Sequence, residues 1–305
     1  MASQKEVKNR VGSIKNIHKI TRAMEMVAAA RLRRAEQRIE ALRPYATEIR
    51  KMTQHVAEHA GGVHIPLLEK REEVRKVGIV LVTGDRGLAG SFNTQIIREG
   101  IRLRREFTAE GTEVAFSVVG RRGNSTMTFR GENVERSYTG FTDRPGFANA
   151  KEISRDLIDA YVKGEIDQVD LVYNRYVSPL TQYVRRHTLL PLHRAEVFGE
   201  GVVNEAPSEE ELAAVEEQKK ALWDFEPAAD ELLPKLFEEY VDLSVYRALL
   251  ESAASEHGAR MTAMRNAAES AQEIIGDLTL EMNRARQAEI TQEILEVVGG
   301  AEALG

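Results

Sequence analysis

The chain has 305 residues, a formal net charge of -6 and no cysteine, which excludes disulfides, thiolate nucleophiles and cysteine-ligated metal centres. Its mean hydropathy is -0.37, and no apolar run approaches the roughly 18 residues of a membrane-spanning helix. The first ten residues lack the apolar core of a signal peptide, so we expect no secretion signal. With 42% hydrophobic residues, the chain can form one or two folded domains.

Aromatic residues and prolines are confined to the middle of the chain. No aromatic residue precedes Tyr45 or follows Tyr246, and the prolines lie between Pro44 and Pro234. Both ends are instead rich in Ala, Glu, Arg, Met and Leu, which favour helices. We therefore expect two long helices around a mixed central domain, with the proline-free spans setting the lengths of two unbroken rods.

The N-terminal segment carries apolar or small residues at an average spacing of 3.5 residues. The predicted seam consists of Val7, Val11, Ile14, Ile17, Ile20, Met24, Val27, Leu32, Ala35, Ile39 and Leu42. A period of 3.5 rather than 3.6 predicts a left-handed coiled coil.

The C-terminal segment has the same period. Its predicted seam consists of Leu243, Tyr246, Leu250, Ala253, His257, Met261, Met264, Ala268, Ala271, Ile275, Leu278, Met282 and Ala285. A helix from about Pro234 to Gly299 would span roughly 95 Å, longer than a compact domain can cover. We expect part of it to be solvated or held by another protein, with two amphipathic helices on a globular core as the alternative.

Charge is unevenly distributed. Residues 1–43 hold eleven Lys/Arg against four Glu, whereas residues 196–239 hold fourteen Asp/Glu against three Lys. A basic helix can bind nucleic acid or a membrane surface, but no aromatic residue interleaves the basic ones to stack on bases. We therefore expect no nucleic-acid partner, and a solvated or acidic-protein-binding face instead. The acidic stretch is predicted to be a linker.

The middle of the chain has an alternating pattern of strands and helices. Strands are predicted at 76–83, 113–119, 133–138, 169–177 and 181–189, and helices at 93–107 and 147–162. Alternation of this kind predicts a mainly parallel sheet with helices on its faces.

A glycine-containing loop, TGDRGLAGSFN at residues 83–93, follows the first strand. It lacks the lysine of a P-loop, and its G-x-x-G-x-x-G spacing differs from the dinucleotide fingerprint. We favour a structural turn over a nucleotide site. Asp85 and Arg86 could act in acid–base or phosphate chemistry, but we favour a role in fixing the loop.

No catalytic or metal-binding constellation stands out. His55 and His59 have the i, i+4 spacing of a helical chelate, yet no third ligand is implied, and we favour an exposed pair. We expect no cofactor, no metal ion and no catalytic residue.

Long blocks at both ends resemble a known family. Residues 8–46, with KITRAMEMVA, and residues 255–304, with ARQAEITQEI, resemble the terminal helices of the gamma subunit of F-type ATP synthases. The loop TGDRGLAGSFN and the segment WDFEP at 223–227 resemble that family's central-domain motif and foot segment. The acidic stretch at about 200–222 is longer than the family's usual connection.

The resemblance implies an α/β fold plus a long coiled coil, in which the terminal helices form an antiparallel left-handed pair flanking a Rossmann-like domain. The implied segments are the N-terminal helix at 1–60, the α/β domain at 74–195, the linker and foot at 196–233 and the C-terminal helix at 234–305.

The resemblance also implies a non-catalytic rotor shaft that couples proton or sodium flow to ATP synthesis or hydrolysis. Its partners would be the alpha and beta subunits, the epsilon subunit and the c-ring. It would lie at the cytoplasmic face of the cell membrane, attached only through the complex.

Matching positions give candidate contact residues. Met24, Arg260, Gln287, Thr291 and Glu293 match positions that contact the ring of alpha and beta subunits, whereas Trp223, Phe225 and Glu226 match the foot that meets the c-ring. For Met24, a place in the coiled-coil seam is the alternative, and the other residues could be ordinary solvated or packing residues.

Overall fold

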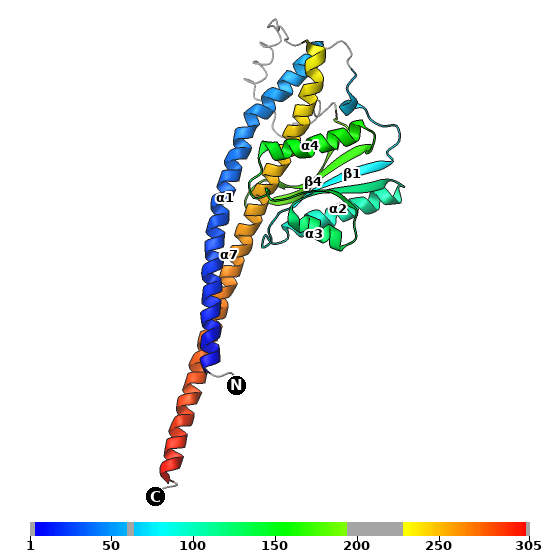
Figure 1. The fold of residues 1–305 in the computed structure, drawn as a ribbon. Coiled ribbons are helices and arrows are strands. Elements are labelled where there is room, and N and C mark those ends of the chain that lie inside the picture. The colour runs from blue at the N-terminus through cyan, green and yellow to red at the C-terminus, as the bar shows by residue number, and fades with distance from the viewer. Residues whose placement is uncertain (1–3, 60–63, 194–227, 303–305) are drawn as a thin grey trace. The chain divides into compact units, whose positions relative to one another are not determined.

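The computed structural model describes residues 4–59, 64–193 and 228–302 (Figure 1). The elements, in chain order, are α1 (Gln4–His59), the short 3-10 helix η1 (Pro66–Leu68), β1 (Lys76–Val82), α2 (Phe92–Ala109), β2 (Glu113–Val119), α3 (Arg121–Phe129), β3 (Val134–Tyr138), α4 (Phe147–Val162), β4 (Gln168–Tyr176), β5 (Gln182–Leu190) and α7 (Ala229–Glu302).

The chain divides into two compact units. We call residues 1–31, 88–90 and 257–305 the helix-pair unit, and residues 32–87 and 91–256 the sheet unit. Helices α1 and α7 each contribute to both units, because each crosses a unit boundary within one continuous helix.

The sheet unit is built on a five-stranded sheet with the order β3-β2-β1-β4-β5. Strand β1 pairs in parallel with both β2 and β4, β2 pairs in parallel with β3, and β5 closes one edge as the antiparallel arm of a hairpin. The four parallel strands, β1 to β4, are joined in turn through α2, α3 and α4, as in a Rossmann-like fold. The predicted mainly parallel sheet is confirmed.

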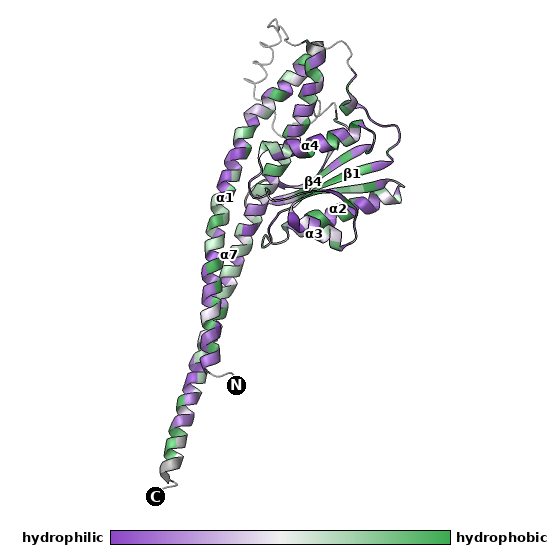
Figure 2. Ribbon diagram, in the orientation of Figure 1, coloured by the Kyte–Doolittle hydropathy of each residue, from purple (hydrophilic) through white to green (hydrophobic). Residues whose placement is uncertain are grey.

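The apolar sequence of β1, KVGIVLV, explains its central place. All residues from Val77 to Val82 are buried, as expected for a strand covered on both faces. Figure 2 shows hydrophobic residues along β1 and β4. Residues of α4 and of the first part of α7 complete the core, among them Ile153, Leu157 and Phe237.

One helix of the sheet unit was not predicted. Helix α3 has the sequence RRGNSTMTF, in which Gly, Asn, Ser and Thr have weak intrinsic helix propensity. Tertiary contacts stabilise it instead. Met127 is completely buried, and the first N–H groups of the helix are bound by residues outside it.

The expectation that prolines limit the two long helices was wrong. Helix α1 continues through Pro44, and α7 contains Pro234. An internal proline removes one backbone hydrogen bond and costs about 3 kcal/mol or more. Around Pro234 this cost is offset by burial, since Leu233 and Phe237 are both almost fully buried.

In the helix-pair unit, the seam of α7 follows the prediction. All nine predicted seam positions from His257 onward are buried or half-buried, namely His257, Met261, Met264, Ala268, Ala271, Ile275, Leu278, Met282 and Ala285. Their spacing alternates between four and three residues, which is the signature of a left-handed coiled coil.

The predicted seam of α1 was wrong in its middle. A stripe at four- and three-residue spacing is buried or half-buried, consisting of Val7, Val11, Ile14, His18, Thr21, Glu25 and Ala28. Of the predicted middle residues, Met24 is half-buried. Ile17, Ile20 and Val27 are instead 48%, 57% and 53% exposed. The 3.5 period is correct, but the seam passes through polar residues one position away from the apolar ones.

The two helices run antiparallel. Glu25 pairs with Arg265 in the helix-pair unit, and Tyr45 pairs with Glu239 in the sheet unit, so the order of contacts along α7 is the reverse of that along α1. The predicted fold class, an α/β domain together with a long antiparallel helix pair, is confirmed.

Candidate functional site

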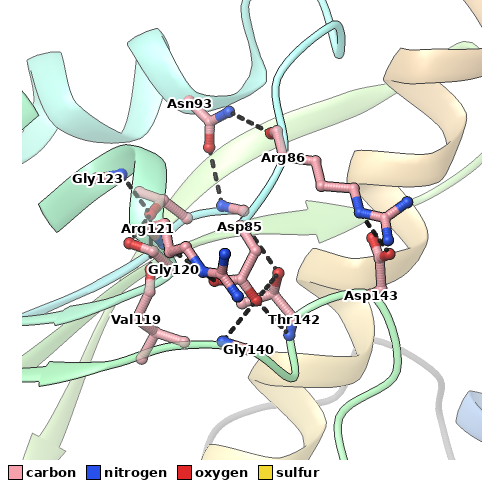
Figure 3. A network of polar contacts seen from close by, with 12 residues as sticks. Asp85, Arg86, Asn93, Val119, Gly120, Arg121, Gly123, Gly140, Thr142 and Asp143 are labelled. Atoms are coloured by element: carbon pink, nitrogen blue, oxygen red, sulfur yellow. Dashed lines mark hydrogen bonds and ion pairs between the residues drawn. The ribbon is translucent and has the colours of Figure 1, made fainter. Parts of the chain in front are cut away.

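The glycine loop after β1 is held by a single carboxylate. Asp85 accepts hydrogen bonds from the backbone N–H groups of Arg121, Gly140 and Thr142 at 2.8–3.1 Å, and from the Thr142 hydroxyl at 3.0 Å (Figure 3). These donors follow β2 and β3, so Asp85 ties together the loops at the carboxyl ends of three neighbouring strands. This agrees with the favoured interpretation that Asp85 fixes the loop.

The first three N–H groups of α3 are bound by consecutive residues after β1. The pairs are Arg121 with the Asp85 carboxylate, Arg122 with the Gly84 carbonyl and Gly123 with the Thr83 hydroxyl, each at 3.1 Å. The free N–H groups at a helix N-terminus are what normally binds a phosphate. At α3 the chain's own oxygens take that place.

Two backbone N–H groups of the glycine loop also donate hydrogen bonds to side chains of the same chain. The N–H of Gly84 donates to the Asn93 side-chain oxygen at 2.8 Å, and the N–H of Asp85 donates to the Thr142 hydroxyl at 2.8 Å (Figure 3). A nucleotide-binding loop directs such amides at phosphate oxygens. The geometry therefore favours a structural turn over a nucleotide site.

Electrostatics reinforce this network. Burial acts to raise the pKa of Asp85, but its backbone and hydroxyl donors outweigh burial and hold that pKa below its ordinary value. Arg86 forms an ion pair with Asp143 at 3.2 Å (Figure 3). The two charged residues that the sequence offered for chemistry are thus bound to the loops around them.

Gly120 permits the close approach of β1 and α3. Its φ is +94°, a conformation that favours glycine, and a Cβ at this position would lie 2.4 Å from the Thr83 carbonyl oxygen. Its own N–H donates to the Tyr138 carbonyl at 2.7 Å.

The helix-pair unit contains a buried carboxylate, paired with two partly exposed arginines, that was not predicted from the sequence. Glu25 is 7% exposed, and its carboxylate accepts from Arg22 of the same helix at 2.7 Å and from Arg265 of α7 at 3.0 Å. Burial acts to raise the pKa of Glu25, but the two arginines, Arg265 first, hold it below its ordinary value. The signal was present in the 3.5-residue spacing of Thr21, Glu25 and Ala28.

The candidate contact residues differ in their surroundings. Met24 is half-buried beside the seam, and Arg260 is 7% exposed, with its guanidinium donating to His257 Nδ1 at 3.4 Å. Gln287, Thr291 and Glu293 are exposed. The foot candidates Trp223, Phe225 and Glu226 lie outside the described residues.

The last part of α7 is uncovered. Across residues 286–299, every side chain that the structure describes is exposed. This segment carries five large apolar residues that are 43–72% exposed, namely Ile290, Ile294, Leu295, Val297 and Val298. A row of exposed large apolar residues is typical of surfaces that contact other proteins.

The described part of the chain has neither a cluster of metal ligands nor a helix that could span a membrane. Within residues 4–59, 64–193 and 228–302, no three His, Asp or Glu side chains are arranged to hold a metal ion. No helix among the same residues is long and apolar enough to cross a membrane.

Fold and surface together define a class of protein: a long antiparallel helix pair joined to a Rossmann-like sheet, with an uncovered helix end for a partner. A family model described as ATP synthase matches residues 3–304. The ATP synthase gamma chains of Rubrobacter xylanophilus and Desulforamulus reducens are each 43% identical to this chain. The matches cover all of this chain and 99% and 100% of those relatives. The chain belongs to the family of ATP synthase gamma chains.

Solved structures agree in fold. A chain of the Euglena gracilis mitochondrial ATP synthase, from an assembly of OSCP, F1 and c-ring, matches with a TM-score of 0.66 and 19% identity. That match covers 99% of this chain and 94% of the other. A chain from the central stalk and c-ring of the Tetrahymena thermophila mitochondrial ATP synthase matches with a TM-score of 0.56 and 27% identity, covering 81% of this chain and 99% of the other.

Proposed function

We propose that this chain is the central shaft of an F-type ATP synthase. It transmits torque between a c-ring and a ring of alpha and beta subunits, and it performs no catalysis itself. Proton or sodium flow through the c-ring drives the rotation, and the chain lies at the cytoplasmic face of the membrane through its complex. The family membership supports the complex, and the geometry of the helices supports the mechanical role.

The observation that carries the proposal is the continuity of α7. This single helix of 74 residues begins in the core of the sheet unit, where Phe237 and Val241 are completely buried, and ends in the uncovered segment 286–299. A shaft needs both features, because torque must enter through a part that is fixed to a globular body and leave through a surface that other subunits contact.

Further contacts fasten α1 within the sheet unit. The hydroxyl of Tyr176 on β4 donates to Glu36 of α1 at 2.5 Å, and the hydroxyl of Tyr45 on α1 donates to Glu239 of α7 at 3.0 Å. These bonds connect sheet and helices side by side, so a twist applied to one element is resisted by the others. The self-occupied glycine loop supports a structural rather than a nucleotide-binding role for the sheet unit.

The contact residues belong to this proposal. Gln287, Thr291 and Glu293 present exposed side chains to the alpha and beta subunits, and Arg260 and Met24 lie at or beside the seam of the helix pair. Trp223, Phe225 and Glu226 are proposed to meet the c-ring, and the epsilon subunit is proposed to bind the same chain.

Coupling tests the proposal. Met24→Lys places a cation beside the seam, where it gains an ion pair with an acidic partner loop in some rotor positions and impedes rotation. We expect the complex to assemble, with less proton pumping for each ATP hydrolysed in membrane vesicles. Met26→Lys, at a 61% exposed position two residues away, is the matched control. Unchanged pumping per ATP in the Met24 variant would refute this assignment.

Composition and activity of the purified complex provide a second test. We expect the chain to co-purify with three copies each of two ATP-binding subunits, and the chain alone to hydrolyse no ATP. A lone monomer or homodimer with turnover that is lost on mutation of residues 84–90 would instead indicate an enzyme.

A further inference from the structure

Helix α1 offers two competing stripes to its partner helix in the helix-pair unit. The stripe that is buried contains His18, Thr21 and Glu25. The stripe one position away contains Ile17, Ile20 and Val27, all of which are about half exposed. Both stripes continue from the same apolar residues, Val7, Val11 and Ile14, so the choice between them is local.

Apolar burial alone favours the other stripe. Coiled coils normally bury the more apolar residues in their seam, and β-branched residues are well suited to it. One residue along an α-helix corresponds to a rotation of about 100°, so a local rotation of that size would bring Ile17 and Ile20 into the seam and move Thr21 and Glu25 out. Some other interaction must hold the polar stripe against α7.

The only charged group in the buried stripe between His18 and Ala28 is Glu25, and its bond to Arg265 crosses between the helices at 3.0 Å. Its bond to Arg22 lies within α1 and is made whichever face meets α7, because both residues move together. Thr21 is satisfied within its own helix, since its hydroxyl donates to the carbonyls of Ile17 and His18. Among the described bonds of Thr21 and Glu25, the interhelical one is thus the bond that depends on which face meets α7.

We infer that the Glu25–Arg265 ion pair selects the face of α1 that meets α7, and so keeps the apolar stripe of Ile17, Ile20 and Val27 on the outside of the helix pair. Buried polar groups are known to fix register in coiled coils at a cost in stability. The functional consequence of this selection, apolar residues on the outer surface of a shaft, rests on the proposed function. The selection itself is a property of the chain alone.

A competing explanation lies in the winding of the coil. From Ile14, the apolar stripe proceeds through two steps of three residues, to Ile17 and then Ile20. Such steps overwind a left-handed coil locally. If winding alone rejected the apolar stripe, the ion pair would have no influence on the exposed face.

Cysteine reactivity distinguishes these explanations, since the chain contains no cysteine and each introduced thiol is the only one. In the full-length isolated chain, Ile20→Cys occupies a 57% exposed position and Thr21→Cys a 9% exposed position. We expect the Cys at 20 to react much faster with a thiol reagent than the Cys at 21. The ratio of the two rates reports which face is outside.

The ion pair is then removed from either side. We expect Glu25→Gln and Arg265→Gln each to lower this ratio at least about tenfold, while helix content measured by circular dichroism is retained. Arg265→Lys should restore most of the ratio, because an ammonium group can still reach the carboxylate. Arg22→Gln, which removes only the bond within α1, should leave the ratio near its original value.

The control for charge removal is Glu6→Gln, which breaks the exposed Arg10–Glu6 ion pair in the same unit and should change nothing. An unchanged ratio in both Gln variants at positions 25 and 265 would overturn the inference in favour of winding. In the Gln variants, the inference requires the Cys at 20 to react more slowly than in the parent chain, because it enters the seam. If the ratio falls only because both thiols react as fast as an exposed thiol, the inference is overturned, since the ion pair would then hold the helices together without selecting a face. Neither result depends on the alpha and beta subunits, so a failure here is distinct from a failure of the proposed shaft.

Discussion

The two units of the chain use apolar and polar residues in opposite ways. In the sheet unit, the apolar residues are inside: Phe116, Leu157 and Leu171 are each at most 1% exposed. In the helix-pair unit, Glu25 and Arg260 are inside, while Ile20 and Leu295 are more than half exposed. The first pattern is that of a domain that is stable by itself, and the second is that of a surface prepared for other subunits.

Polar groups also have different tasks in the two units. In the sheet unit, Asp85 binds backbone N–H groups of the loops after β2 and β3. It therefore stabilises loops at the edge of a fold whose core is already determined by apolar burial. In the helix-pair unit, Glu25 lies in the seam itself, where it replaces an apolar contact. We expect substitutions to affect stability most in the first unit and partner contact most in the second.

The largest loss of stability is expected from a substitution in the core of the sheet unit. Phe116→Ala should lower the free energy of unfolding by about 3–5 kcal/mol, because it removes a ring that is 1% exposed and leaves a cavity. Urea-induced unfolding followed by circular dichroism measures the loss. Phe129→Ala, at a ring that is 92% exposed, is the matched control and should change the value by no more than about 0.5 kcal/mol. Equal effects of the two variants would contradict the packing described for this unit.

A smaller loss of stability is expected at the glycine loop. Asp85→Ala should lower the free energy of unfolding by about 1–3 kcal/mol, because three backbone N–H groups lose their acceptor. The exposed Asp159→Asn on α4 serves as the control.

The same carboxylate predicts a pH dependence. Because the folded-state pKa of Asp85 lies below its unfolded value, its contribution is complete above the unfolded pKa and is lost as pH falls through the folded pKa. The stability difference between wild type and Asp85→Ala should therefore shrink in acid. A difference that grows as pH falls would contradict the network in Figure 3.

A modest gain in stability is expected from replacing a buried carboxyl between α4 and α7. Asp242 is 5% exposed and accepts a hydrogen bond from the Ser154 hydroxyl. Burial raises its pKa, which the Ser154 bond only partly counteracts. The folded state therefore favours the protonated form, and stability falls as pH rises through the folded pKa. Asp242→Asn should stabilise the chain by about 1 kcal/mol or less at pH values above the folded pKa.

Thermal unfolding over a series of pH values tests this directly. The stabilisation by Asp242→Asn should grow as pH rises through the folded pKa of Asp242, because the buried wild-type carboxyl then becomes charged. Ser154→Ala is the companion variant, because it removes the donor and leaves the carboxyl. A loss of stability in the Asn variant that grows with rising pH would show that the charge of Asp242 is favourable in the fold.

The smallest effect on stability is expected at the uncovered end of α7. Ile294→Ser, at a 58% exposed position, should change the unfolding free energy of the isolated chain by no more than about 0.5 kcal/mol. The same variant should weaken association with the alpha and beta subunits, measured by co-purification. Ser is unfavourable there only if a partner covers the residue, so intact association would argue against burial of this segment in the complex.

The sheet was predictable from sequence because its signals are local. The run KVGIVLV predicted β1, and the helical spacing of Ile153, Leu157 and Tyr161 predicted α4 at its observed bounds. Helix α3 was missed because its stability comes from Met127 and from acceptors supplied by another loop, which no local pattern contains.

The helix pair shows a different limit. Periodicity gave the seam of α7 and the 3.5-residue repeat of α1, but choosing apolar residues put Ile17 and Ile20 inside. The actual seam depends on an ion pair with Arg265, which is 240 residues from Glu25 in the sequence. Asp85 was correctly expected to fix its loop, whereas its donors after β2 and β3 became identifiable only from the fold.

Rotation tests the central claim of a torque-bearing shaft most directly. Phe129→Cys supplies a single thiol at a 92% exposed position of the sheet unit, to which a visible probe can be attached. With the alpha and beta subunits fixed to a surface and ATP supplied, the shaft account predicts continuous rotation of the probe in one direction. Steady ATP hydrolysis by complexes whose attached probe stays still would contradict it.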